Sequence, residues 1–221
     1  MEFAHFFDPL VFITEIVFTI IAVVFCFIIY SKTKDIYDLT KYKGIKYFRN
    51  AFLFFGLSYA MRFLFSLVIL STITFDFILP RGRLVPFFIL PLGYFSTVGI
   101  FYLVFSSIWK SFKNRNLPIL GHGVAILLSV ISFFTRSHLI LLYFQSALLI
   151  LAATLSSILH KNQKKVSGMK VLYFLVSVIW LINLWVIGRR RPFSFEIDIF
   201  FQLVSLAVFI VILHKISKWV K

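Results

Sequence analysis

The sequence predicts an all-α integral membrane protein that crosses the bilayer several times. Of its 221 residues, 61% are hydrophobic and 14% are charged, and the mean hydropathy is +0.97. A soluble domain is about 45–50% apolar and about 25% charged, so this chain has more apolar surface than a soluble core can bury. The apolar segments run for about 20 residues without turn residues, which indicates helices rather than the alternating strands of about 10 residues that form barrels.

Seven apolar segments mark the expected transmembrane helices. Each approaches the length needed to cross a hydrocarbon core of about 30 Å. Little chain remains between them, so we expect a single membrane domain over residues 1–221 and no soluble domain. The expected helices cover 9–30, 47–72, 84–109, 118–135, 138–160, 169–188 and 194–214.

The basic residues predict the orientation. The connections on one side carry only Arg81, Arg83, Arg136 and the run Arg189 to Arg191, and Arg62 lies within a segment, so every other lysine and arginine falls on the opposite side. Cytoplasmic connections carry the excess of these residues. We therefore expect the N-terminus outside, the C-terminus in the cytoplasm, and a multi-pass location in the plasma membrane.

The net charge of +15 does not indicate a nucleic-acid partner, because the positive residues lie in short connections between apolar segments. The lipid bilayer is the expected partner. The chain begins without a basic residue ahead of the first apolar run and carries Glu2 and Asp8 there. This start predicts no cleavable signal peptide.

Arg62 lies near the middle of the second segment, YFRNAFLFFGLSYAMRFLFSLVILST. A guanidinium group stays charged, so at this depth it must face the protein interior or a wet cavity and find a partner. Glu15 is the only carboxylate expected deep inside a segment. At about 1.5 Å per residue, Glu15 lies about 9 Å and Arg62 about 15 Å from the outer ends of their helices. An arginine side chain can bridge that difference, so we predict that Glu15 and Arg62 pair or share a site.

Other strongly polar side chains also fall in the outer half of the expected bundle, and two interpretations remain open. Either a buried ion pair locks two helices and the amides join further helices, or the polar residues line an outward-facing pocket for a small ligand or ion. The candidate ligand-binding residues are Glu15, Tyr59, Arg62, Tyr94, Gln145, Asn183 and Gln202.

No metal site, cofactor or catalytic site is expected. Cys26 is the only cysteine, so neither an internal disulfide nor a cysteine metal cluster can form. His122, His160 and His214 fall near the inner ends of three segments without paired spacing or an accompanying carboxylate. The chain contains no phosphate-binding loop and no nucleophile with a recognisable base, so we expect that it is not an enzyme.

Two weaker patterns concern helix movement and internal symmetry. Pro91 lies inside the third segment, where it removes a hydrogen bond and is expected to kink the helix. KGIKYF opens the second segment and GMKVLYF opens the sixth, and both lead to arginine-rich turns. A true repeat would give a three-plus-one-plus-three arrangement, as in transporters with parallel repeats.

The helix count and expected topology resemble those of seven-helix receptors and of small sugar-transporter bundles, in count alone. A retinal protein needs a lysine in the middle of the last helix, and 202–212 contains none.

Three functions follow from these patterns. The first is a sensor or receptor-like module for a small polar or anionic ligand, in which Arg62 binds the ligand, Glu15 holds Arg62, and the signal passes to a cytosolic or membrane partner. The second is a small transporter or channel that uses the same residues and bends at Pro91. The third is a structural or assembly subunit of a membrane complex.

Overall fold

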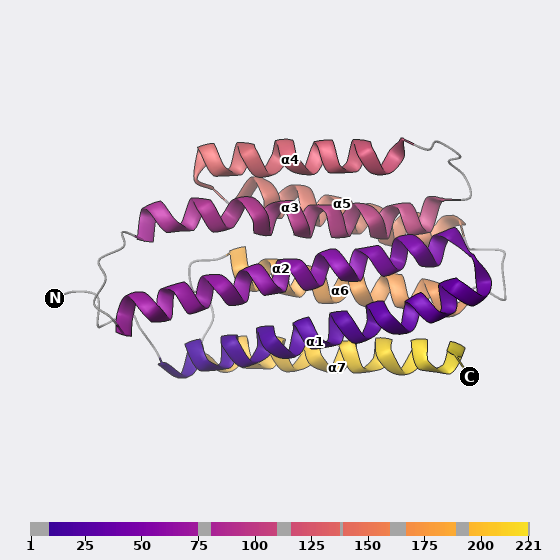
Figure 1. Ribbon diagram of the computed structural model, residues 1–221, viewed down its shortest axis with the longest axis horizontal. Helices are drawn as coiled ribbons and strands as arrows, with labels where there is room; N and C mark the ends of the chain where they lie inside the picture. The colour runs from indigo at the N-terminus through magenta and orange to yellow at the C-terminus, as the bar shows by residue number, and fades with distance from the viewer. Residues whose placement is uncertain are drawn as a thin grey trace.

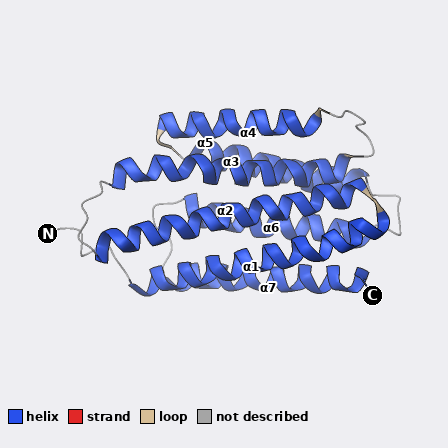
Figure 2. Ribbon diagram, in the orientation of Figure 1, coloured by secondary structure: helices blue, strands red, loops and turns tan. Residues whose placement is uncertain are grey.

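The computed structural model describes residues 9–74, 81–109, 116–137, 139–159, 167–188 and 195–220. Within these residues it contains seven α-helices and no strand (Figure 2), which confirms the all-α prediction. The helices are α1 (Pro9–Thr40), α2 (Lys43–Thr74), α3 (Arg81–Ile108), α4 (Leu117–Thr135), α5 (Leu139–Leu159), α6 (Ser167–Gly188) and α7 (Phe195–Val220).

Five helices, α1 to α4 and α7, are long and apolar enough to cross a membrane. In α5 and α6 the apolar stretches among the described residues are shorter, Leu139–Leu155 and Val171–Asn183. The chain is therefore a helical, membrane-type protein with several candidate spans. Seven spans and the orientation of the bundle remain predictions.

The hairpin of α1 and α2 is longer than hydropathy indicates. The basic stretch expected to be a loop is helical except at Lys41 and Tyr42, because no proline or glycine interrupts the chain between residues 10 and 43. Lys41 adopts a left-handed backbone, with φ 52°, and this ends α1. A helix of 32 residues is about 48 Å long, against a hydrocarbon core of about 30 Å. The hairpin is therefore longer than the hydrocarbon core is thick.

Successive helices run antiparallel, so α1 begins at one end of the bundle and α7 ends at the other (Figure 1). We call these the Pro9 end, which is the predicted outer end, and the Lys41 end. Six helices form a closed ring in which each contacts the next, in the order α1, α2, α3, α5, α6, α7 and back to α1. Helix α4 lies outside this ring, mainly against α3.

Aromatic side chains fill the centre of the ring between α2 and α6. Phe55 stacks on Trp180 with ring centroids 4.3 Å apart, and Phe48 meets Tyr173 edge-on at 5.7 Å. Gly99 lets α3 approach this layer, since a Cβ atom there would lie 2.6 Å from the Phe55 ring. Helix α3 itself runs continuously through Pro86 and Pro91, and the kink at Pro91 remains a prediction.

Candidate functional site

Glu15 and Arg62 form an ion pair between α1 and α2. Arg62 Nε donates a hydrogen bond to Glu15 Oε1 at 2.9 Å. The Arg62 side chain is 9% exposed and that of Glu15 is 31% exposed, so the carboxylate occupies the more open position. This contact confirms the predicted pairing.

The ion pair leaves part of the guanidinium group unsatisfied. Arg62 Nη1 is buried and makes no hydrogen bond within the described part of the chain, and the same is true of Tyr59 Oη and Trp180 Nε1. Burying a polar hydrogen without a partner costs about 1–3 kcal/mol in proteins. Unpartnered buried donors therefore indicate an acceptor that is still to be identified.

Tyr59 lies next to Arg62, and Trp180 lies against Tyr59. Tyr59 precedes Arg62 by one turn on α2, and its ring is 5.5 Å from that of Trp180 on α6. Phe18, one turn beyond Glu15 on α1, meets the Tyr59 ring edge-on at 6.0 Å, and Phe209 on α7 lies 6.3 Å from it. Aromatic residues of three other helices, α1, α6 and α7, thus surround Tyr59.

The two buried amides join helices. Asn183 Nδ2 donates to Ile179 O within α6 at 2.8 Å and to Ser205 Oγ on α7 at 3.2 Å. Gln145 Nε2 on α5 donates to Ser96 Oγ at 2.7 Å and to Thr97 Oγ1 at 2.8 Å, both on α3. These contacts match the interpretation in which amides hold helices together.

Tyr94 turns away from Arg62 and towards α4. Its hydroxyl lies 2.9 Å from His122 Nδ1, and the Tyr102 hydroxyl lies 3.2 Å from His122 Nε2. Tyr94 and Tyr102 are separated by about 12 Å along α3, so His122 sits between their levels, deeper than its place near the start of α4 indicates. The depth of Tyr94 predicts a place beside Arg62, but depth does not reveal which face of a helix a residue occupies.

Gln202 lies on α7 and is partly exposed. It makes no hydrogen bond to the described residues, and no contact among them joins it to Arg62. The sequence-predicted candidates therefore divide into one group around Arg62, two helix-joining amides, a tyrosine–histidine contact and one solitary amide.

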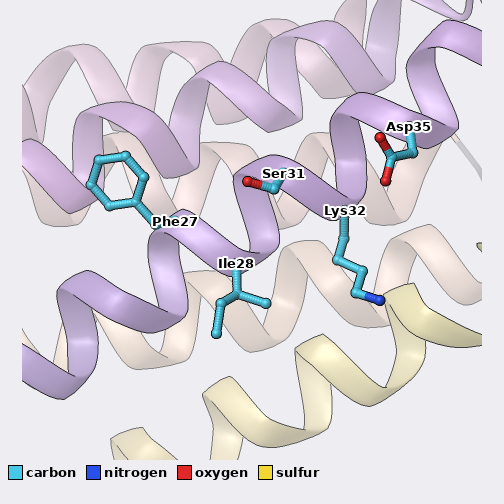
Figure 3. A pocket seen from close by; sticks show the side chains of 5 residues that line it. All are labelled: Phe27, Ile28, Ser31, Lys32 and Asp35. Carbon is cyan, nitrogen blue, oxygen red and sulfur yellow. The ribbon is translucent and has the colours of Figure 1, made fainter.

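A shallow hollow of about 280 Å³ lies elsewhere on α1 (Figure 3). Its lining residues all belong to α1, and the Lys32 side chain reaches towards α7. The hollow begins at Phe27, which is about 18 Å along α1 from Glu15. It is therefore not the pocket that the sequence predicts around Arg62. The lining residues are Phe27, Ile28, Ser31, Lys32 and Asp35.

A protein of Archaeoglobus fulgidus is 30% identical to this chain over 216 residues, and the alignment covers 95% of this chain and 94% of the relative. The chain belongs to the family of that archaeal protein. The relative carries the name "Uncharacterized protein", so membership of this archaeal family does not choose between a sensor, a transporter and an assembly role. No protein-family model matches the chain, and no solved structure matches it.

For this member of the archaeal family, the structure adds two residues that sequence reasoning missed. Trp180 carries one of the seven buried side-chain atoms that lack a hydrogen bond among the described residues, and His122 bridges two tyrosines. A tryptophan in an apolar segment gives no signal of a polar role, and His122 is close enough to the basic connection to resemble an interfacial residue. Among the described residues, no three histidine, cysteine or acidic side chains lie together as a metal site would require.

Proposed function

We propose that the protein is a non-catalytic sensor or receptor-like module of the plasma membrane, in which the group around Arg62 binds a small polar or anionic ligand. The supporting observation is the state of Arg62, whose Nε is held by Glu15 while its buried Nη1 has no partner among the described residues. A cation fixed by a carboxylate and still carrying unused donors is suited to bind an acceptor group on a ligand.

Access of a ligand to Arg62 from one side supports a sensor rather than a transporter, in which the ligand would pass through the bundle. Glu15 is the more exposed partner, whereas Phe18 and Tyr59, immediately towards the Lys41 end, are each 2% exposed. The aromatic layer continues towards that end through Phe55 and Phe52, which are also buried. A ligand at Arg62 would therefore meet a packed core beyond it.

The signal would pass to a partner at the Lys41 end. The α1–α2 hairpin, which is longer than the hydrocarbon core is thick, exposes there Lys32, Lys34, Lys41, Lys43 and Lys46. An acidic surface on a cytosolic or membrane partner would complement this charge. Since α1 carries both Glu15 and part of the hairpin, a shift of α1 on ligand binding would reach the partner directly.

The experiment measures ligand binding by the purified protein in lipid nanodiscs. Acetate, lactate, glycine and acetamide are titrated while the unfolding temperature is followed, because a ligand that binds only the folded state raises it. We expect at least one compound to stabilise the wild type and the Arg136→Gln control, whose arginine is exposed at the end of α4, and none to stabilise Arg62→Gln. Should Arg62→Gln fail to fold, Tyr59→Phe takes its place with a weaker response expected. Stabilisation of neither wild type nor control, or equal stabilisation of all variants, would contradict the proposal.

A small transporter is the second candidate, and the helix neighbours favour it. If α1, α2 and α3 change places with α5, α6 and α7, in that order, every helix–helix contact of the ring falls on another contact of the ring. Helix α4 stays outside, as a linker between two repeats would. This pattern suits the repeat suggested by KGIKYF and GMKVLYF. Uptake of a stabilising compound into proteoliposomes would favour transport, whereas binding without uptake would favour the sensor.

A further inference from the structure

Three donors, on Arg62, Tyr59 and Trp180, have no acceptor among the described residues, and these three residues are more than nine-tenths buried. The exposed fraction is 7% for Arg62, 2% for Tyr59 and 5% for Trp180. Arginine and the tryptophan ring can only donate hydrogen bonds, and the tyrosine hydroxyl can donate one. In a membrane interior, no bulk water satisfies such groups. A bound group rich in acceptors would satisfy all three.

Charge balance restricts what that group can be. Arg62 and Glu15 together are neutral, so an added anion would leave one uncompensated negative charge in a medium of low dielectric constant. An anion fits without this cost when the Glu15 carboxylate is neutralised by a proton. The exposed fractions of the side chains indicate which partner can yield, since the Glu15 side chain is 31% exposed and the Arg62 side chain is 9% exposed.

The groups that face Glu15 leave it as the residue that takes up the proton. Across the interface, α2 presents Arg62 and Tyr59. On α7, which also contacts α1, the ionisable residues near this end are Glu196 and Asp198 in the first turn. Between Phe12 and Ser31, α1 carries no other ionisable side chain except Cys26 and Tyr30, which are two or more turns further along.

We propose that Glu15 is the resident anion of the Arg62 site, and that a small monovalent anion binds by replacing it while Glu15 takes up one proton. This inference rests on the proposed function and specifies its ligand class. The hydrogen bond from Arg62 Nε to Glu15 Oε1 breaks, and the anion accepts hydrogen bonds from Arg62, Tyr59 Oη and Trp180 Nε1. One anion and one proton enter together, so the charge of the site stays at zero. The close contacts of Phe18, Tyr59 and Trp180 favour an ion of the size of nitrate or a halide.

Nitrate binding as a function of pH tests this exchange. The protein in nanodiscs is titrated with sodium nitrate against sodium gluconate at constant ionic strength, and the unfolding temperature gives the dissociation constant at pH 5, 6, 7 and 8. For the wild type we expect nitrate affinity to fall by up to about tenfold for each rise of one pH unit, because one proton enters with each anion. Asp198→Asn serves as the matched control and should keep this slope.

The variants distinguish replacement of Glu15 by the anion from a role in which Glu15 only positions Arg62. Glu15→Gln should bind nitrate at least tenfold more tightly than the wild type at pH 7 and with no dependence on pH. Tyr59→Phe and Trp180→Phe should each bind several-fold more weakly while keeping the slope. Nitrate binding that needs Arg62 but weakens in Glu15→Gln, or shows no pH slope in the wild type, would overturn the exchange and leave the proposed function standing. Absence of binding by nitrate and by every compound of the earlier panel would overturn both.

Discussion

Arg62 reaches from α2 to Glu15 on α1 with a single hydrogen bond of 2.9 Å from Nε, and its Nη1 stays buried without a partner in the described chain. A purely structural ion pair would be expected to use the guanidinium group more fully, because bidentate pairing is the stronger geometry. The single contact and the more open position of Glu15 are the observations on which the proposed ligand-binding role of this pair rests.

Removing either charge should destabilise the protein. Glu15→Gln leaves a buried cation that cannot lose its proton, and Arg62→Met leaves a carboxylate without its partner. We expect each to lower the free energy of unfolding by about 2–3 kcal/mol, below the 3–5 kcal/mol of a fully buried pair because Glu15 is partly exposed. The double variant should lose less than the sum, which a double-mutant cycle in gluconate buffer measures. Additive losses would mean that the contact contributes nothing.

Gln145 should stabilise the bundle, and Gln202 should not. Gln145→Leu removes both hydrogen bonds to α3, although Ser96 Oγ keeps its own bond to Gly93 O, so we expect a loss of about 1–3 kcal/mol. Gln202→Leu makes the same chemical change at a partly exposed position of α7 without hydrogen bonds to the described residues. Thermal unfolding in nanodiscs compares the two, and an equal effect would contradict the role assigned to Gln145.

The close approach of α2 and α3 at Gly99 should tolerate no side chain. An alanine Cβ would lie 2.6 Å from the Phe55 ring, and that ring cannot withdraw because it stacks on Trp180. We expect Gly99→Ala to cost about 1–3 kcal/mol.

Gly123→Ala is the matched control for Gly99→Ala. No atom lies within 4 Å of an added Cβ at that position. Alanine should therefore stabilise α4 slightly, through its higher helix propensity of up to about 1 kcal/mol. If Gly99→Ala unfolds at the same temperature as Gly123→Ala, the packing account of Gly99 is wrong.

Hydropathy and charge predict the helices and the ion pair for clear physical reasons. A run of about 20 apolar residues has few alternatives to a spanning helix. Glu15 and Arg62 were predictable as partners because each is the only deeply embedded charge of its sign and their depths agree. The extension of α1 to Thr40 was not predictable from hydropathy, because polar residues beyond the bilayer can continue a helix as readily as they can end it.

The remaining site residues depend on helix rotation, which depth does not determine. Tyr94 lies at the depth of Arg62 but on a face of α3 that meets α4, and its partner His122 belongs to a helix outside the ring. Trp180 resembles its apolar neighbours until the structure shows that its Nε1 is buried without an acceptor. Only the arrangement of the helices separates such residues from ordinary packing.

His122 should hold α4 against α3 through its two tyrosine contacts. Phenylalanine at this position keeps the aromatic contact with Phe54, now 5.7 Å between ring centroids, but loses the hydrogen bonds to Tyr94 and Tyr102. Because His122 is only partly buried, we expect His122→Phe to lower the free energy of unfolding by about 1–2 kcal/mol. Adding Tyr94→Phe to His122→Phe should cost little more, since the hydroxyl removed has already lost its partner. Full additivity of these two substitutions in thermal unfolding would show that Tyr94 and His122 act independently and that α4 is held by its apolar contacts alone.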